Sequence, residues 1–318
     1  MHPSRKENGA AGVTLREMTR SYAPLLFFLA AIWGASYLFI KVGVRDFEPS
    51  FFIDMRLWIA GLLLFAFLAL REGGREAVVA VRSTWREGLI FGTINGALPF
   101  TLIAWGEKHI DSGVAAIANA SVPIFVAIPA TRFNPSERSS GTRLAGIILG
   151  LVGVGVLAGV DPSGGAWAVI GTLAVVLASF SYACGGLYGQ RAVGHQPGPV
   201  LATSSMLYGA LVLLPLALFQ LPDHAPDWKP VASLLALAVG GTAIAQLVLF
   251  RMLRLFGAAR VSLVTYLLPV TALVYGAAIL NEPLRPSMLG GLGLILGGVA
   301  LGSGIWRPIR RTTAAAET

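Results

Sequence analysis

The sequence is poor in charged residues, in histidine and in cysteine. Only 13% of the 318 residues are Asp, Glu, Lys or Arg, and the mean hydropathy is +0.71. A chain with so little charge cannot cover an apolar interior with a polar surface, which excludes an ordinary water-soluble protein. The single cysteine, Cys184, has no internal disulfide partner. The four histidines fall in expected tails or turns, so we predict no metal site and no cofactor.

Long apolar stretches are what the sequence has instead. Each is about 17 to 22 residues long, which at about 1.5 Å per residue matches a hydrocarbon layer about 30 Å thick. We therefore predict an all-α membrane protein with polar tails at 1–23 and 307–318. The ten predicted membrane-spanning helices cover residues 24–44, 50–70, 88–105, 113–130, 144–160, 167–188, 199–219, 231–253, 260–280 and 287–304.

The basic residues predict how these helices are oriented. Most of the 24 Lys and Arg residues fall in the tails and in every second connection. Basic residues in short loops stay on the cytoplasmic side, so both termini are expected in the cytoplasm. The formal charge of +8 then reflects topology and anionic lipid rather than nucleic acid. We expect a multi-pass protein of the bacterial inner membrane.

The charge bias also reveals an internal repeat. The turn after the third predicted helix carries only Lys108, whereas its counterpart after the eighth carries Arg251, Arg254 and Arg260. Such a reversal is expected when an odd number of helices is duplicated and the copies insert in opposite directions. The sequence predicts two inverted five-helix repeats, at 24–160 and 161–306.

Several short motifs carry a family resemblance. In the second half they are Gly241–Ala245, Arg251–Arg260, Leu267–Val270 and Asn281–Leu284, and in the first half Ala31–Ser36 and Asp54–Gly61. Their residues and spacing resemble the drug/metabolite transporter superfamily, specifically its ten-helix EamA-type members. The resemblance covers nearly the whole chain and implies export of small organic metabolites such as amino acids, without fixing the substrate.

Prolines inside the predicted helices mark candidate helix breaks. Pro123 and Pro269 hold matching places in the two halves, and Pro99 adds a third. Each removes a backbone hydrogen bond, which hydrocarbon tolerates where the site faces protein or a cavity. We expect these prolines to line a central path; the alternative is an ordinary kink.

Polar and aromatic residues at mid-membrane depth are the candidate cavity lining. Trp33 and Tyr37 lie one turn apart and could form a gate or stack on a substrate, the alternative being packing against a neighbouring helix. The polar candidates are Asn95, Asn119, Ser121, Tyr182, Ser205, Tyr208, Gln246, Thr265 and Tyr266. Hydrogen bonds between helices are the alternative for each of them, but as a group they favour a polar passage.

Arg56 is the one charge expected well inside a span. It could reach outward to water or pair with Asp46, Glu48 or Asp54. Alternatively its guanidinium binds a carboxylate, either of the substrate or of a gating partner. Both interpretations stay open from the sequence.

Acidic residues are missing from the first predicted helix. Glu107, Asp111, Glu137 and Glu282 are all expected at helix ends, so a buried carboxylate for proton exchange has no obvious position. We therefore expect a facilitative or weakly coupled secondary transporter that works by alternating access through a cavity between the repeats.

Two other classes of function compete with this interpretation. A membrane scaffold needs no solvated interior, and an intramembrane enzyme needs a nucleophile and a base at membrane depth, which the sequence does not offer. We expect no enzyme activity. The partners are a small-molecule substrate and the lipid bilayer, and we expect a monomer. A dimer formed through the glycine-rich fifth and tenth helices is the alternative.

Overall fold

The protein is described by a computed structural model in residues 15–126, 141–158, 165–193 and 196–303, where all regular structure is helical. The segments are α1 (Leu15–Gly43), α2 (Pro49–Glu72), α3 (Gly74–Ser83), α4 (Trp85–Gly92), η1 (Thr93–Ala97), α5 (Leu98–Glu107), α6 (Ser112–Asn119), α8 (Gly141–Ala158), α9 (Gly165–Tyr188), η3 (Gly189–Val193), α10 (Gly198–Leu218), α11 (Trp228–Ala236), η4 (Leu237–Ile244), α12 (Ala245–Phe256), α13 (Ala258–Val261), α14 (Val264–Leu280) and α15 (Pro286–Ser303).

Every predicted membrane-spanning helix overlaps a helical stretch of this structure. Six stretches are long and apolar enough to cross a membrane, namely Tyr22–Gly43, Pro49–Glu72, Trp85–Glu107, Gly165–Arg191, Gly198–Leu218 and Trp228–Phe256. Four apolar helices are shorter in the described residues: Ser112–Val126, Leu144–Leu157, Val264–Leu280 and Pro286–Leu301. The helical membrane fold is confirmed, while ten crossings with cytoplasmic termini remain a prediction.

Two local features differ from the expectation. The first helix begins at Leu15, so it includes the end of the predicted tail 1–23. The rest of that tail, the 307–318 tail and most of the predicted 130–144 connection, with Glu137, lie outside the described residues. In addition, the connection after the second span forms the helix α3, which buries Ala77 and Val81 against the bundle. Its short length hid this helix from an analysis of long apolar runs.

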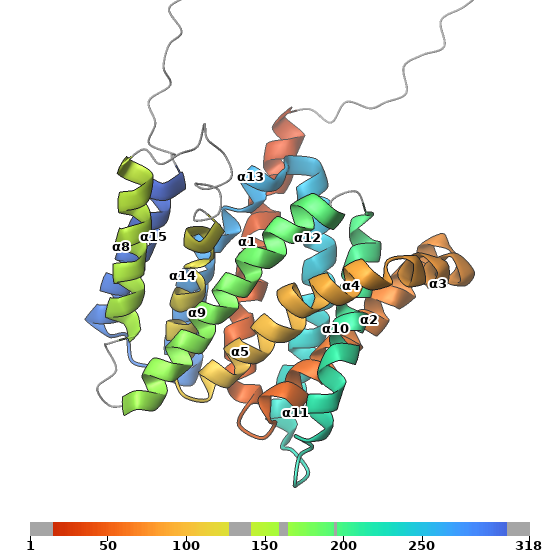
Figure 1. The fold of residues 1–318 in the computed structure, drawn as a ribbon, viewed down its shortest axis with the longest axis horizontal. Coiled ribbons are helices and arrows are strands. Elements are labelled where there is room, and N and C mark those ends of the chain that lie inside the picture. The colour runs from red at the N-terminus through yellow and green to blue at the C-terminus, as the bar shows by residue number, and fades with distance from the viewer. Residues whose placement is uncertain (1–14, 127–140, 159–164, 194–195, 304–318) are drawn as a thin grey trace, which may run out of the picture.

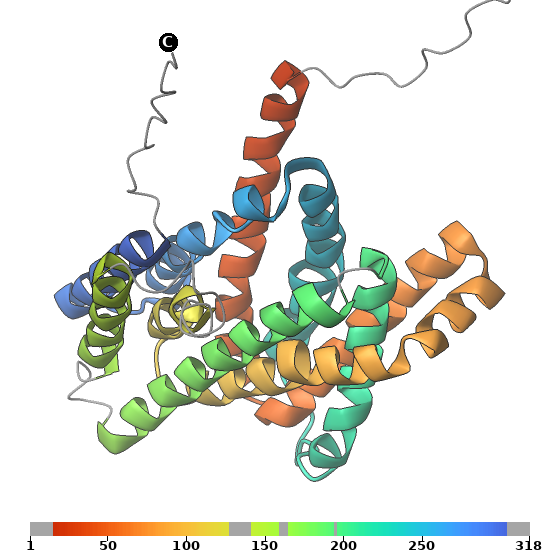
Figure 2. The same ribbon diagram turned by 45° about the horizontal axis from the view of Figure 1, so that its top comes forward.

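The two halves are inverted with respect to one another. The beginning of α1 and the end of α15 lie at the top of Figure 1, which we call the termini end, and the opposite end is the far end. Helix α1 runs from the termini end to the far end, whereas α9, its counterpart in the second half, runs the other way (Figures 1 and 2).

Helix packing repeats this symmetry. Helix α2 packs against α10, and α8 packs against α15, so that each of these helices contacts its own counterpart. Helix α1 contacts α14 and the α11–α12 span, and α9 correspondingly contacts α6 and α5. Helices of each half therefore contact helices of the other half, and residues of both halves surround the space between them.

The glycines of α8 and α15 explain the close packing of that pair. A Cβ atom at Gly298 would lie 2.6 Å from the backbone nitrogen of Gly150, and one at Gly153 would lie 2.9 Å from the nitrogen of Ile295. Only glycine permits such an approach of two backbones. This glycine face is thus used for packing within the chain.

Two π-helical segments, η1 and η4, occupy matching places in the third helix of each half. A π-helical turn inserts extra backbone into an α-helix, and such turns are frequent at functional sites. The segments contain Gly96 and Gly240–Gly241, respectively. These glycines were the sequence signal for the distortion.

Candidate functional site

A cavity of about 290 Å³ lies between the two halves. The first half contributes side chains from α1, α2, η1, α5 and α6, and the second half contributes them from α9, η4, α12 and α14. Neither α10 nor the α8–α15 pair contributes a lining residue. The volume is just below the range typical of small-molecule sites, about 300 to 1,000 Å³.

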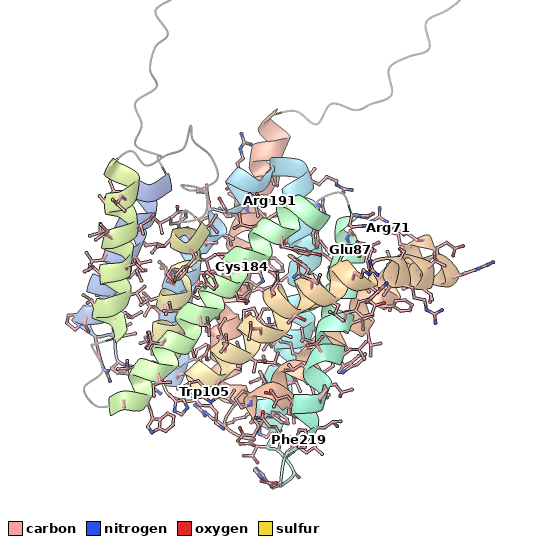
Figure 3. The ribbon with its side chains drawn as sticks, in the orientation of Figure 1. Arg71, Glu87, Trp105, Cys184, Arg191 and Phe219 are labelled. Atoms are coloured by element: carbon pink, nitrogen blue, oxygen red, sulfur yellow. The ribbon has the colours of Figure 1, made fainter. Side chains whose placement is uncertain are left out.

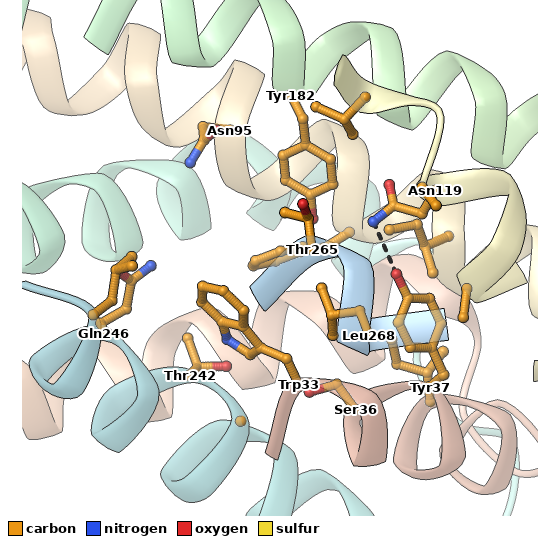
Figure 4. Close-up of a pocket in the computed structure, with 18 of the residues that line it drawn as sticks. Trp33, Ser36, Tyr37, Asn95, Asn119, Tyr182, Thr242, Gln246, Thr265 and Leu268 are labelled. Atoms are coloured by element: carbon orange, nitrogen blue, oxygen red, sulfur yellow. Dashed lines mark hydrogen bonds between the residues drawn. The ribbon is translucent and has the colours of Figure 1, made fainter. Parts of the chain in front are cut away.

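Most predicted site residues line this cavity. In Figure 4, Asn95 and Tyr182 lie on one side of the view and Trp33, Thr242 and Gln246 on the other. The structure brings together Trp33, Tyr37, Arg56, Asn95, Asn119, Pro123, Tyr182, Gln246 and Thr265. They come from seven of the predicted spans.

Four predicted polar residues do not line the cavity. Ser121 is fully buried and donates a hydrogen bond to the carbonyl of Ala118, and Ser205 likewise bonds within its own helix. Tyr208 packs against α3 and donates to the carbonyl of Val81, because α10 turns that face away from the centre. Tyr266 is adjacent to Thr265 on α14 but is not a lining residue.

The three prolines play different parts. Pro123 lines the cavity and follows a turn at residues 120–121 that ends α6, so it marks a true break. Pro99 is buried at the start of α5, directly after η1. The expectation of a break at Pro269 was wrong, since α14 continues across it. Its missing N–H instead leaves the carbonyl of the cavity residue Thr265 without its usual helical donor.

Arg56 is held in the cavity wall by two contacts. Its Nε donates a hydrogen bond of 2.8 Å to Oγ1 of Thr242, and its Cζ lies 3.8 Å from the centre of the Phe100 ring. Thr242 in turn donates to the carbonyl of Leu237 within η4. These contacts fix the plane of the guanidinium and leave its terminal nitrogens available to an occupant of the cavity.

The structural alternatives proposed for Arg56 do not match this geometry. The side chain is only 4% exposed, so it does not reach outward to water. Glu48 pairs instead with Lys108, and Asp46 accepts a hydrogen bond from the backbone of Asp227. Within the described part of the chain, no ion pair joins Arg56 to Asp54 or to another acid. The one formal charge in the cavity lining is therefore positive.

A second polar group in the wall is equally well fixed. The amide nitrogen of Asn119 donates to the hydroxyl of Tyr37 over 2.8 Å, as the dashed line in Figure 4 shows. Its carbonyl oxygen accepts from Ser179 over 3.2 Å. The contact joins α1, α6 and α9, so Asn119 presents its remaining hydrogen-bonding capacity in a defined direction.

Sequence analysis missed several lining residues. Phe100 and Thr242, which orient Arg56, lie beside features that did attract attention: Pro99 and the Gly241–Ala245 motif. Neither residue type is unusual in a membrane helix, so only the fold reveals their role. No group of three or more His, Cys, Asp or Glu residues that could hold a metal ion occurs in the described residues.

An inverted helical repeat that surrounds a polar cavity at its centre is the architecture of a secondary membrane transporter. The chain belongs to the EamA-like transporter family, whose sequence profile matches residues 21–159 and 169–304. Each match covers one half of the bundle. The expected membership of the drug/metabolite transporter superfamily is thus confirmed.

Relatives carry transporter names. The chain is 28% identical over 280 residues to the "Uncharacterized inner membrane transporter YedA" of Escherichia coli strain K12, covering 87% of this chain and 88% of that one. It is 29% identical over 307 residues to a "Probable amino-acid metabolite efflux pump" of Salmonella typhimurium, covering 93% and 98%. A protein of the same name from Escherichia coli strain K12 is 26% identical over 293 residues, covering 89% and 94%.

The fold has also been seen in a crystal structure of another protein. That chain is 19% identical, superposes with a TM-score of 0.62, and the match covers 90% of this chain and 97% of that one. The comparison supports the architecture alone. Together, the family and the named relatives make this a multi-pass membrane transporter and give no sign of an enzyme.

Proposed function

We propose that the protein is a secondary transporter of the bacterial inner membrane that exports small organic metabolites carrying a carboxylate, such as amino acids. The single observation that carries the proposal is the buried guanidinium of Arg56, which lines the central cavity without an acidic partner there. Relatives named as amino-acid metabolite efflux pumps agree with this substrate class.

The cavity fits an alternating-access mechanism. Ile40, Ile103 and Ala116 are almost fully buried lining residues toward the far end, whereas Gln246, Leu249 and Thr265, toward the termini end, are partly exposed. Polar contacts between loops close the far end beyond this point, including the 2.8 Å ion pair of Lys108 with Glu48. In the proposed cycle this state accepts substrate from the termini end, and opening of the far end releases it.

The charge distribution supports cytoplasmic termini for the proposed exporter. Arg71 and Arg191 lie toward the termini end (Figure 3), and the exposed Arg251, Arg254 and Arg260 lie in α12 and α13 at the same end. The described loops of the far end hold more acids than bases, namely Asp46, Glu48, Asp111, Asp223, Asp227 and Glu282 against Arg45, Lys108 and Arg285. Under the positive-inside rule the far end then faces the periplasm.

The proposed transport is facilitative or weakly coupled. None of the lining residues is Asp or Glu, so the cavity holds no acid that substrate and proton could occupy in turn. Substrate gradient alone would then drive net export.

The test is counterflow of radiolabelled metabolites in proteoliposomes. A buried charge-assisted hydrogen bond contributes about 1.5 to 3 kcal/mol, so Arg56→Lys, which loses the two-pronged geometry, should weaken apparent affinity for a carboxylate substrate about tenfold or more. Arg56→Ala should weaken it further. Arg71→Lys, an exposed position at the end of the same helix, is the matched control and should transport normally.

Each outcome has a definite meaning. Equal affinity in wild type and Arg56→Lys would remove Arg56 from substrate recognition. Absence of counterflow for any amino acid or related carboxylate would contradict the proposed substrate class.

A further inference from the structure

A buried carboxylate lies outside the cavity, at the far end of the bundle. Glu107 is the last residue of α5, and its side chain is fully buried. Neither carboxylate oxygen has a hydrogen-bond partner within the described residues. An ionised carboxylate in such a place would lose its hydration without gaining a hydrogen bond, at a cost of several kcal/mol.

The nearest cation is committed to other acceptors. The Lys41 ammonium of α1 donates to the backbone carbonyls of Glu107 and Ile110, each over 2.7 Å. These carbonyls are at the C-terminal end of α5, where the helix dipole is negative and attracts a cation. Lys41 therefore holds the end of α5 rather than forming a hydrogen-bonded ion pair with the Glu107 side chain, although the two charges still interact.

A second acid supplies the negative charge that balances Lys41. The Glu282 carboxylate accepts hydrogen bonds from the backbone nitrogen and hydroxyl of Ser112, over 2.9 and 2.7 Å, and from the nitrogen of Gly113 over 3.2 Å. These donors lie at the N-terminus of α6, which stabilises an anion. Glu282 is thus held in place by three hydrogen-bond donors, and its charge repels a second anion at Glu107.

We propose that Glu107 is a proton-binding site, separate from the substrate cavity, which is occupied when the far end is closed and empty when the far end opens. When Glu107 is protonated it carries no charge, and the positive charge of Lys41 is balanced by the negative charge of Glu282. Opening separates α1, α5–α6 and the α14–α15 connection, exposes the carboxyl to water and releases one proton, since a hydrated glutamate ionises above about pH 4. The proposal rests on the proposed function, because transport requires the far end to open.

The proton returns to the side from which it came. Glu107 has no exposed surface while the far end is closed, so it exchanges its proton only through the opened far end. No proton crosses the membrane in such a cycle, which agrees with facilitative transport. The site instead makes opening dependent on pH at the far side, and acid there favours the closed state.

Other ionisable groups also lie near α5, and the buried Asp54 on α2 likewise has no hydrogen-bond partner for its carboxylate within the described residues. The ionisable groups on helices that pack against α5 are Tyr37 and Lys41 of α1, Asp54 and Arg56 of α2, and Tyr182 of α9. The adjoining connections add Lys108, His109, Asp111 and Glu282. The pKa of His109 is lowered by partial burial and by the nearby cations Lys108 and Lys41. His109 is therefore neutral near pH 7 and supplies no opposing charge.

A cysteine at Ile110 can report opening of the far end. The Ile110 side chain is 4% exposed and does not line the cavity, so a thiol there reacts with a maleimide when the far end opens. Purified protein with Cys184→Ser and Ile110→Cys is labelled in detergent from about pH 5 to about pH 8. Asp223→Cys, in an exposed loop at the same end, corrects for the ionisation of the thiol itself.

The relative labelling rate at Ile110→Cys should fall with decreasing pH, by up to about tenfold per pH unit for one bound proton. Glu107→Gln, which is neutral at every pH, should give slow labelling with no such slope. Glu107→Asp should keep a slope, and so should Asp223→Asn, the matched control in an exposed loop at the same end. The proposal is overturned if wild type shows no slope, or if Glu107→Gln retains it.

Labelling needs no substrate, so the two proposals fail separately. A normal pH slope without counterflow of any solute would contradict the proposed function and leave the proton site standing. Normal counterflow together with an unchanged pH slope in Glu107→Gln would support the proposed function and overturn the proton site.

Discussion

At the scale of single residues, Arg56 depends on neighbours that have no charge. Phe100 offers a ring face to the guanidinium, and Thr242 accepts the hydrogen bond from Nε. In a cavity with few polar groups, a guanidinium without these contacts would sample several directions. The pair therefore orients the binding group in advance, which reduces the entropic cost of binding.

Thr242→Val tests this orientation. The substitution keeps the shape of the side chain but removes the acceptor, and a hydrogen bond to a charged group contributes about 1.5 to 3 kcal/mol. We expect apparent affinity in counterflow to weaken by up to about tenfold. Thr172→Val is the matched control, because the buried Thr172 hydroxyl bonds only to its own helix, at Ala168, away from the cavity. Unchanged affinity in Thr242→Val would show that Phe100 alone suffices.

At the scale of elements, the helices divide into two kinds. Helices α8, α10 and α15 contribute nothing to the cavity lining, and close glycine contacts join the α8–α15 pair. By contrast, the third helix of each half is interrupted by η1 or η4, and both π-helical segments supply lining residues, namely Asn95 and Thr242. In these two spans, distorted backbone thus occurs where polar groups are presented, whereas the third π-helical segment, η3, supplies no lining residue.

Gly298→Ala and Gly290→Ala separate packing from helix propensity. Both positions lie in α15, where alanine favours the helix by about 1 kcal/mol over glycine. At Gly298 the new methyl would meet the backbone of Gly150, whereas at Gly290 nothing lies within 4 Å. We expect Gly298→Ala to lower the unfolding temperature in detergent, since overpacking costs about 1 to 3 kcal/mol, and Gly290→Ala to leave it unchanged or raise it. Equal unfolding temperatures of the two variants would mean that α15 does not approach α8 closely at Gly298.

At the scale of the whole molecule, the far end is closed by contacts that bridge the two halves. Ser50 on α2 donates its backbone N–H to Gln220 after α10, Asp46 accepts from Asp227, and Glu282 binds the start of α6. These contacts lie in loops and at helix ends rather than in helix interiors. This is the interface that the proposed transport cycle must open.

The orientation in the membrane is tested by cysteine labelling in intact cells, with Cys184 replaced by serine. Asp223→Cys at the far end should react with a membrane-impermeant maleimide added outside, because this loop is expected in the periplasm. Arg254→Cys, exposed at the termini end, should react only after the cells are opened. The reverse pattern would invert the topology and turn the proposed exporter into an importer.

The sequence by itself determined the helical membrane fold, the approximate limits of its apolar segments, their division into two related halves and the family. Those features follow from composition, from helix length against bilayer thickness and from charge in the loops, all of which are local. It also identified most of the polar cavity residues, because polar groups are rare at membrane depth.

The tertiary structure alone decided which polar groups converge. It placed Tyr208 against α3, kept α14 continuous through Pro269, and brought Phe100 and Thr242 to Arg56. It also turned Glu107, expected at an ordinary helix end, into a buried acid, because α1 and the α14–α15 connection cover it. Burial and pairing depend on segments that are distant in the sequence, so no local pattern records them.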